Sequence, residues 1–312
     1  MRLDIAAQTD IGRRKRKNED ACAVYREDTP GLRFFEQGAL LSVADGLGGH
    51  LGGEIASKLA VSHVKDLLQQ PPPAMPTSNE ELDESDIGPL PAMRAAIFRA
   101  NESIYRDNIA HGIARTGKGM GTTLLTALVE PGRVYIGNVG DSRAYHLRGG
   151  EIIDKTEDHS WVDEQVRLGR MSKAEAETDR RKNVVTRCVG THAQIEVDTY
   201  RWFVVPGDML LLCSDGLVNM VADKAIQEIF RRHGTAAEIA QKLVQTANDN
   251  GGRDNITVIV ASISPKPLRL IYLRLRSALR HHGRKMLWGA AWILSCIASF
   301  AAGYLIHQNL GQ

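Results

Sequence analysis

One short pattern occurs four times in this chain and constrains its fold more than any other feature. In each copy, an apolar, strand-like run ends or begins at an aspartate that stands beside a glycine or an asparagine. A single Asp-Gly pair after a strand is an ordinary turn. Four copies predict instead a fold that gathers several carboxylates at strand ends. The four aspartates are Asp45, Asp141, Asp215 and Asp254.

Gathered carboxylates repel one another unless positive charge lies between them. No lysine or arginine accompanies most of the four positions, so divalent cations are the expected compensation. The four cysteines of the chain stand far apart, and no Cys/His spacing suits zinc. Oxygen ligands without paired histidine or cysteine favour hard ions, which predicts Mn²⁺ or Mg²⁺ as the cofactor.

Hydrophobic periodicity predicts a single α+β domain over residues 1–265. Short turns separate most of the strand-like runs, which favours antiparallel sheets with helices outside them. Residues 70–91 hold six of the 11 prolines together with several acidic residues, so we expect an acidic, proline-rich loop inserted in this domain. The predicted helices cover 53–69, 92–109, 224–232 and 236–248, and the predicted strands cover 39–44, 122–129, 133–139, 143–148, 200–205, 208–213 and 255–263.

The formal net charge of +2 conceals two unlike regions. Seven of the 39 lysines and arginines, and none of the 37 aspartates and glutamates, lie beyond residue 265. The body therefore carries 32 basic against 37 acidic groups, and the tail carries +7. This split argues against a nucleic-acid-binding body and for a tail that meets an anionic membrane. The N-terminus lacks the apolar core of a signal peptide, so we expect the body in the cytoplasm.

Residues 286–306 form a run of 21 residues without a charge. A helix of that length rises roughly 31 Å, enough to cross the hydrocarbon core of a bilayer. Basic residues at 266–285 flank only its N-terminal side, which predicts a juxtamembrane linker and a single-pass transmembrane helix in the cytoplasmic membrane. The alternative is a buried helix of a soluble domain. Small residues recur every four positions and would allow a weak homodimer through this helix, at Ala291, Ser295, Ser299 and Gly303.

Seven motifs, in order from about Ile5 to Ile263, resemble those of a known family. The chain is similar to the bacterial form of the metal-dependent Ser/Thr protein phosphatases (PPM family, protein phosphatase 2C type). The motifs are TDIG at 9–12 with NED at 18–20, VADGLGGH at 43–50, GMGTT at 119–123, GNVGDSRA at 137–144, DHS at 158–160, LCSDGL at 212–217 and RDNIT at 253–257.

The resemblance implies a four-layer α-β-β-α sandwich with two antiparallel sheets and a dinuclear Mn²⁺ or Mg²⁺ centre at one edge. By motif, Asp45 would bridge both ions and the Gly46 carbonyl would bind one of them. Asp215 and Asp254 would hold the other ion.

Three further acidic positions are implied as metal ligands by the same resemblance. Asp20, with Glu19 beside it, would complete the site mostly through bound water. Asp141 matches the aspartate that binds a third metal in bacterial members of the family.

The substrate phosphate is implied to contact a basic residue five positions before Asp20. Relatives carry arginine at that position, whereas here it is Lys15, between Arg14 and Arg16. Lysine supplies charge without the bidentate geometry of arginine, so either Lys15 or a neighbouring arginine would bind the phosphate. The segment 160–190 resembles the family's flap, for which we expect a role in substrate access. Its charged composition also fits a plain pair of exposed helices.

These observations predict a protein-serine/threonine phosphatase in which a metal-bridging water attacks phosphoserine or phosphothreonine. Its expected partners are phosphorylated proteins, namely a bacterial Ser/Thr kinase that it opposes or the substrates of that kinase. One alternative is a non-catalytic scaffold of the same fold that binds phosphoproteins. Another is a two-metal phosphoesterase acting on small molecules or nucleic acid, which the acidic body disfavours.

Overall fold

The computed structural model describes residues 1–26, 38–47, 52–65, 88–110, 119–232 and 234–265. Met1–Ser264 forms the first of two units of the chain and is compact. The predicted linker at 266–285, the predicted transmembrane helix at 286–306 and residues 70–87 of the predicted acidic loop lie outside the described residues. Among the helices that the structure does describe, none is both long and apolar enough to cross a bilayer.

Two five-stranded antiparallel sheets form the centre of the first unit. The first sheet has the order β1 (Arg2–Asp10), β12 (Ile256–Ser264), β11 (Asp208–Cys213), β8 (Arg143–Arg148) and β9 (Glu151–Lys155). The second has the order β10 (Asp198–Phe203), β7 (Arg133–Val139), β6 (Leu124–Glu130), β3 (Ala39–Ala44) and β2 (Ala21–Arg26). A two-stranded ladder joins β4 (Gly46–Leu47) to β5 (Gly121–Thr122).

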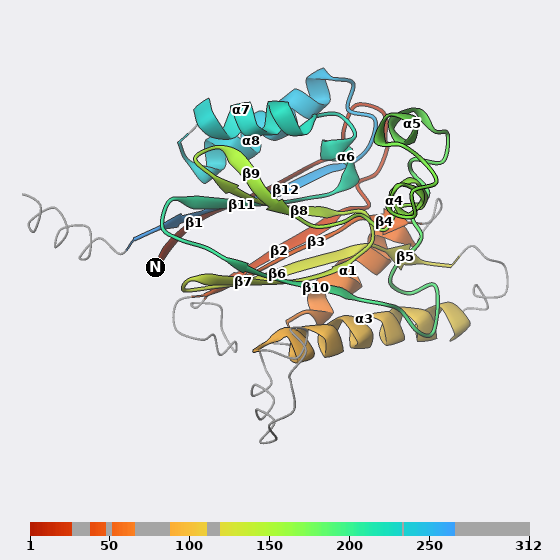
Figure 1. Cartoon of the computed structure of the whole chain (residues 1–312). Helices are drawn as coiled ribbons and strands as arrows, with labels where there is room; N and C mark the ends of the chain where they lie inside the picture. Colours follow the sequence, from red (N-terminus) through yellow and green to blue (C-terminus); the bar gives the residue numbers. More distant parts are fainter. Residues whose placement is uncertain (27–37, 48–51, 66–87, 111–118, 233, 266–312) are drawn as a thin grey trace, which may run out of the picture. The chain divides into compact units, whose positions relative to one another are not determined.

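Helices cover the outer face of each sheet (Figure 1). The first sheet is covered by α7 (Asp223–Arg232) and α8 (Ala236–Asp249), and the second by α1 (Gly53–His63) and α3 (Leu90–Ala110). Three short helices lie at the end of the sandwich that also carries β4 and β5 (Figure 1), namely α4 (Trp161–Arg167), α5 (Lys173–Thr178) and α6 (Asp215–Val218). The predicted α+β fold with antiparallel sheets and flanking helices is confirmed.

Three apolar clusters fill the three spaces between the four layers. In β3, Leu40 packs toward α1 and α3, whereas its neighbour Leu41 packs between the two sheets. Successive side chains of a strand point to opposite faces, so a strand covered on both faces is apolar along most of its length. This is why β3 has six consecutive buried residues and is evident as an apolar run in the sequence.

Two predicted elements have different ends: the strand expected at 200–205 covers Asp198–Phe203, and the helix expected at 53–69 ends at His63. The sequence-based expectations were also wrong at three kinds of position. Strands β1, β2 and β9 were not predicted. All three are edge strands whose residues are half-buried or exposed and give a weak apolar signal. The expected loop at 70–91 ends earlier, because Leu90 and Pro91 belong to α3. Proline is tolerated in the first turn of a helix, where its missing N–H would have no partner.

The third departure lies beside the predicted site. The run expected as one strand at 122–129 is broken at Thr123, between β5 and β6. The Thr123 backbone N–H donates to the Asp45 carbonyl (2.9 Å), and its hydroxyl accepts from the Asp45 N–H (2.8 Å). The strand is therefore interrupted in order to hold the residue that follows β3.

Candidate metal centre

Five aspartates meet at one end of the sandwich, each beside the end of a strand. Asp45 connects β3 to β4, and Asp141 follows β7. Asp215 is the first residue of α6, two positions after the last residue of β11, while Asp254 precedes β12 and Asp20 precedes β2. Both sheets contribute, because β11 and β12 belong to the first sheet and β2, β3 and β7 to the second. The sequence pattern therefore identified residues that the fold brings to the same end.

The backbone of Asp45 is held from two sides. Besides its two hydrogen bonds to Thr123, its carbonyl accepts a bond from the Thr122 hydroxyl at 2.8 Å. The hydroxyl of Thr123 is 2.7 Å from that of Ser142, the residue after Asp141. Asp45 is thus fixed by its main chain, and the position of the Asp141 loop is coupled to it through one buried pair of hydroxyls.

Two of the aspartates carry buried oxygens that lack a hydrogen-bond partner among the described residues. Oδ2 of Asp20 accepts from the Ser214 hydroxyl at 2.8 Å, whereas its Oδ1 has no partner. Oδ2 of Asp215 accepts from the Asn219 amide at 3.0 Å, and its Oδ1 likewise has none. Buried polar atoms are almost always paired, and an unpaired carboxylate oxygen is an available ligand for a cation.

Burial is the largest cause of the protonation shifts at this end of the sandwich, and repulsion between the carboxylates adds to it. Burial and the negative charges of Asp215 and Asp254 together raise the pKa of Asp20 to about 7. Burial raises the pKa of Asp215 to about 6, with the charge of Asp254 acting in the same direction. For Asp45 and Asp141 the pKa lies well above the ordinary value for the same two reasons. Divalent cations would remove this repulsion, so the donor set fits Mn²⁺ or Mg²⁺.

The glycines beside two of these aspartates are needed because other backbone lies against them. A Cβ on Gly46 would stand 2.4 Å from the Gly53 carbonyl group and 2.6 Å from the Glu19 carbonyl oxygen. A Cβ on Gly216 would stand 1.8 Å from the Asn255 carbonyl oxygen. The Asp-Gly pairs are therefore sites of close approach between strand ends, and not only turns.

The basic loop after β1 reaches the same place. The Nζ of Lys15 is 2.6 Å from Oδ1 of Asp254. Burial lowers the pKa of Lys15, but its hydrogen bond to Asp254 and the nearby negative charges of Asp254, Asp45 and Glu19 outweigh this and raise it. Arg14 and Arg16 are exposed and make no side-chain hydrogen bond or ion pair with any described residue. Of the three residues predicted to meet the substrate phosphate, the structure thus brings Lys15 to the carboxylates.

Asn255 is a structural member of the site that the sequence reasoning left without a role. Its Oδ1 accepts from the Glu19 N–H at 2.9 Å, and its Nδ2 donates to the carbonyls of Ile11 (3.0 Å) and Lys17 (2.9 Å). One amide side chain therefore holds both the basic loop and the Glu19–Asp20 segment against Asp254. The only signal for this in the sequence is its place directly after Asp254 in the RDNIT motif.

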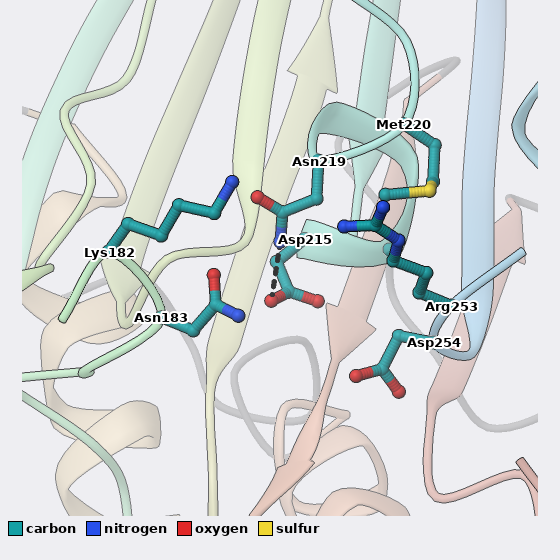
Figure 2. A pocket seen from close by; sticks show the side chains of 8 residues that line it. Lys182, Asn183, Asp215, Asn219, Met220, Arg253 and Asp254 are labelled. Atoms are coloured by element: carbon teal, nitrogen blue, oxygen red, sulfur yellow. Dashed lines mark hydrogen bonds between the residues drawn. The ribbon is translucent and has the colours of Figure 1, made fainter. Parts of the chain in front are cut away.

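A pocket opens over Asp215 and Asp254 (Figure 2). Asn219 and Met220, which follow α6, form part of its wall together with Arg253. The remaining wall comes from Lys182 and Asn183, in the turn after α5 within the predicted flap. Neither residue was singled out from the sequence, because nothing in the local pattern indicates that the flap turns back over Asp215.

Within the described residues, no three His, Cys, Asp or Glu side chains already converge as a ligand set for one ion. The assignment of Glu19, Asp20, Asp45, Gly46, Asp141, Asp215 and Asp254 as metal ligands stays a prediction. The structure adds two observations. The buried Oδ1 atoms of Asp20 and Asp215 have no hydrogen-bond partner among the described residues, and the pKa values of both carboxyl groups are raised.

A four-layer sandwich with carboxylates gathered at one end is the arrangement that the sequence resemblance implies for the metal-dependent phosphatases. Comparison with known proteins then gives the family: the family model for protein phosphatase 2C matches residues 11–259. This chain belongs to the protein phosphatase 2C family. The prediction of an enzyme of the serine/threonine phosphatase class is confirmed, as is the prediction of Mn²⁺ or Mg²⁺, which phosphatases of this type use.

Individual relatives agree with this assignment. The serine/threonine phosphatase stp of Listeria monocytogenes is 37% identical over 81% of this chain and 93% of that protein. Among solved structures, Stp1 from Staphylococcus aureus is 33% identical, with a TM-score of 0.71 over 85% of this chain and 96% of the other. The catalytic domain of the phosphatase PstP, in complex with two manganese ions, is also 33% identical, with a TM-score of 0.66 over 84% and 99% of the two chains.

Proposed function

We propose that this phosphatase hydrolyses phosphoserine and phosphothreonine in proteins at the carboxylate end of the sandwich. The observation that carries the proposal is the pair of unpaired, buried oxygens on Asp20 and Asp215, of which Asp215 lines the open pocket. The residues that would hold the metal ions are Glu19, Asp20, Asp45, the carbonyl of Gly46, Asp141, Asp215 and Asp254.

Bound divalent cations would lower the pKa of a water and offset charge on the phosphoryl oxygens. The chain itself would supply positioning. The fixed backbone of Asp45 limits the motion of its carboxylate, and Ser214 orients that of Asp20. Lys15, which is already paired with Asp254, would place a positive charge where the phosphate enters. No cysteine is required as a nucleophile, since the mechanism needs no phosphoenzyme.

The test compares phosphate release from a phosphoserine peptide by wild type, Asp45→Asn and Asp249→Asn. A chelator should abolish the activity of wild type and Mn²⁺ should restore it. Asp45→Asn should lower the activity by more than about 100-fold, because a ligand matters more than the outer groups whose loss costs 10- to 100-fold. Asp249 is exposed on α8 and serves as the matched control.

Full activity of Asp45→Asn would contradict the proposed mechanism. A wild-type protein that binds Mn²⁺ and phosphopeptide but releases no phosphate would favour the scaffold alternative instead.

We also propose that residues 286–306 anchor the enzyme in the cytoplasmic membrane, with the phosphatase domain in the cytoplasm. The support is the uncharged run of 21 residues and the basic linker before it. Cell fractionation should find the full chain in the membrane pellet after an alkaline carbonate wash, and a chain ending at residue 265 in the supernatant. Extraction of the full chain by carbonate would contradict the anchor.

The physiological substrates would be the targets of a Ser/Thr kinase, or the kinase itself. The support is the phosphatase class together with the expected cytoplasmic location. Phosphoproteomics of cells carrying Asp45→Asn in place of wild type should show a set of phosphoserine and phosphothreonine sites that increase. An unchanged set would contradict opposition to a kinase.

A further inference from the structure

Basic residues surround the carboxylate pocket although the body of the protein carries an excess of acidic groups. The loop at 13–17 consists of five consecutive lysines and arginines, and the turn at 180–182 of three. The first reaches the pocket through Lys15, which contacts Asp254. The second lines the pocket directly through Lys182, and Arg253 adds another cation. Positive charge is therefore concentrated locally around an acidic floor.

Two of these cations already have partners. Lys15 is paired with Asp254 at 2.6 Å. Arg181 donates to both carboxylate oxygens of Asp179, at 3.1 and 3.0 Å, and stacks 3.4 Å from the centre of the Trp161 ring. Both groups are engaged within the fold, so binding a further anion would cost each of them part of an existing contact.

Lys182 and Arg253 differ from them. Both are exposed, both line the pocket, and neither side chain makes a hydrogen bond or an ion pair with any described residue. Figure 2 shows Lys182 and Asn183 on one side of the pocket, Arg253 on the other and Asn219 between them. A rim of two unpaired cations and two amides has the donors that a carboxylate or a phosphate accepts.

We propose that Lys182 and Arg253 form a subsite for a second anionic group of the substrate, next to the phosphorylated residue. The second group is the carboxylate of a flanking aspartate or glutamate, or a second phosphate. The inference rests on the proposed function and names its substrate class. The reacting phosphate belongs at the floor, where Asp215 and Asp254 lie, whereas Lys182 and Arg253 stand on the exposed rim.

The experiment uses the full chain with Mn²⁺ and three peptides that share one phosphoserine. The first has neutral flanks, the second has glutamates on both sides, and the third has a second phosphoserine nearby. We expect kcat/KM about fivefold higher for the anionic peptides than for the neutral one, mainly through KM, since exposed ion pairs are worth a few-fold each. The preference should decrease as salt is added.

Lys182→Gln and Arg253→Gln should each reduce that preference to about twofold or less. Lys173→Gln is the matched control, because Lys173 is an exposed flap lysine outside the pocket lining, and it should keep the wild-type preference. The glutamate and phosphoserine peptides separate the two sources of the second anion.

Two results would overturn the subsite. One is an unchanged preference in both glutamine variants. The other is an equal loss toward the neutral and the anionic peptides, which would place Lys182 and Arg253 at the reacting phosphate. If wild type released no phosphate from p-nitrophenyl phosphate or any peptide, the proposed function would fail, but the subsite would still be decided. In that case the Kd values of the three peptides, measured by calorimetry on the same variants, show the preference or its absence.

Discussion

Gly216 shows how little space separates the two elements that carry Asp215 and Asp254. Its missing Cβ would overlap the carbonyl oxygen of Asn255, and no flexible side chain is there to move aside. Gly216→Ala must therefore push α6 away from the start of β12. Overpacking of this kind costs about 1–3 kcal/mol in the free energy of unfolding. We expect that loss, together with weaker Mn²⁺ binding, measured by urea unfolding and by calorimetry.

The control for this variant is Gly234→Ala. Gly234 has open space where its Cβ would be and no positive φ, so alanine there should leave both measurements near wild type. Equal effects of the two substitutions would mean that the contact between α6 and Asn255 is not the reason why a side chain at position 216 destabilises the fold.

Single residues differ in how far the sequence could reveal their roles. Asp45 and Asp215 could be predicted because each follows a central strand with a strong run of apolar residues, which is a local pattern. The role of Lys182 could not be predicted, because its position beside Asp215 in the pocket depends on the path of the flap. Asn255 and Thr123 were missed because both act on the backbone of distant segments, and such long-range bonds leave no periodic signal.

At the scale of elements, β8 and β11 are joined by a buried charge at the end of the pair away from Asp215. Asp208 at the start of β11 is fully buried and accepts two hydrogen bonds from Arg148, at 2.7 and 2.8 Å. It also lies 2.9 Å from Nε2 of His146. Burial alone would raise the pKa of Asp208, but the bonds from Arg148, the Val205 N–H and His146 outweigh it and hold the pKa at about 2.

This depressed pKa predicts a pH-dependent contribution to stability. An aspartate that is easier to ionise in the fold than in the unfolded chain stabilises the fold above pH about 4, and the contribution is lost as the pH falls through about 2. The shift corresponds to about 2 kcal/mol at neutral pH. We therefore expect Asp208→Asn to lower the free energy of unfolding by about that amount at pH 7, in urea titrations, and by progressively less toward pH 2.

Asp154→Asn provides the comparison at the same histidine. Its carboxylate is 3.1 Å from Nδ1 of His146 but is 47% exposed, so its loss should cost less than that of Asp208. A loss for Asp208→Asn that stays constant from pH 7 to pH 2 would show that the charge is not what stabilises the β8–β11 pair.

Elements also differ in how well the sequence predicted them. The central strands β3, β7, β8 and β11 have the predicted bounds because most of their residues are buried and mainly apolar. The edge strand β1 alternates between exposed and half-buried residues and was missed. Pairing with β12 makes it a strand, and that partner is more than 240 residues away in the chain.

For the whole molecule, the fold concentrates negative charge at one end of the sandwich at a cost in stability. Asp20 and Asp215, with pKa values of about 7 and 6, bind protons more tightly in the fold than in the unfolded chain. In the metal-free protein, the contribution of these two groups to the free energy of unfolding should therefore be largest near pH 4. It should be lost as the pH rises through 6 and 7. A cation that binds only the ionised carboxylates reverses this trend.

The raised pKa values of Asp20 and Asp215 predict how the thermal stability of the full chain responds to Mn²⁺. At 100 times its Kd, a ligand that binds only the folded state adds about 2.7 kcal/mol, which for a chain of this size raises Tm by about 5–10 °C. Protons compete for the same carboxylates, so the increase should be small at pH 5 and reach its full size at pH 8. Scanning calorimetry of the chelated protein, with and without Mn²⁺, measures it at each pH.

The dependence on pH separates a specific site from general screening of the acidic body. Screening by a divalent cation would stabilise the fold at any pH at which surface carboxylates are ionised, which includes pH 5. It would also act equally on wild type and on Asp45→Asn. Binding at the sandwich end requires Asp20 and Asp215 to ionise, and these two groups do so between pH 6 and 7. A shift in Tm that is the same at pH 5 and pH 8, or that Asp45→Asn retains in full, would therefore place the ions elsewhere on the protein.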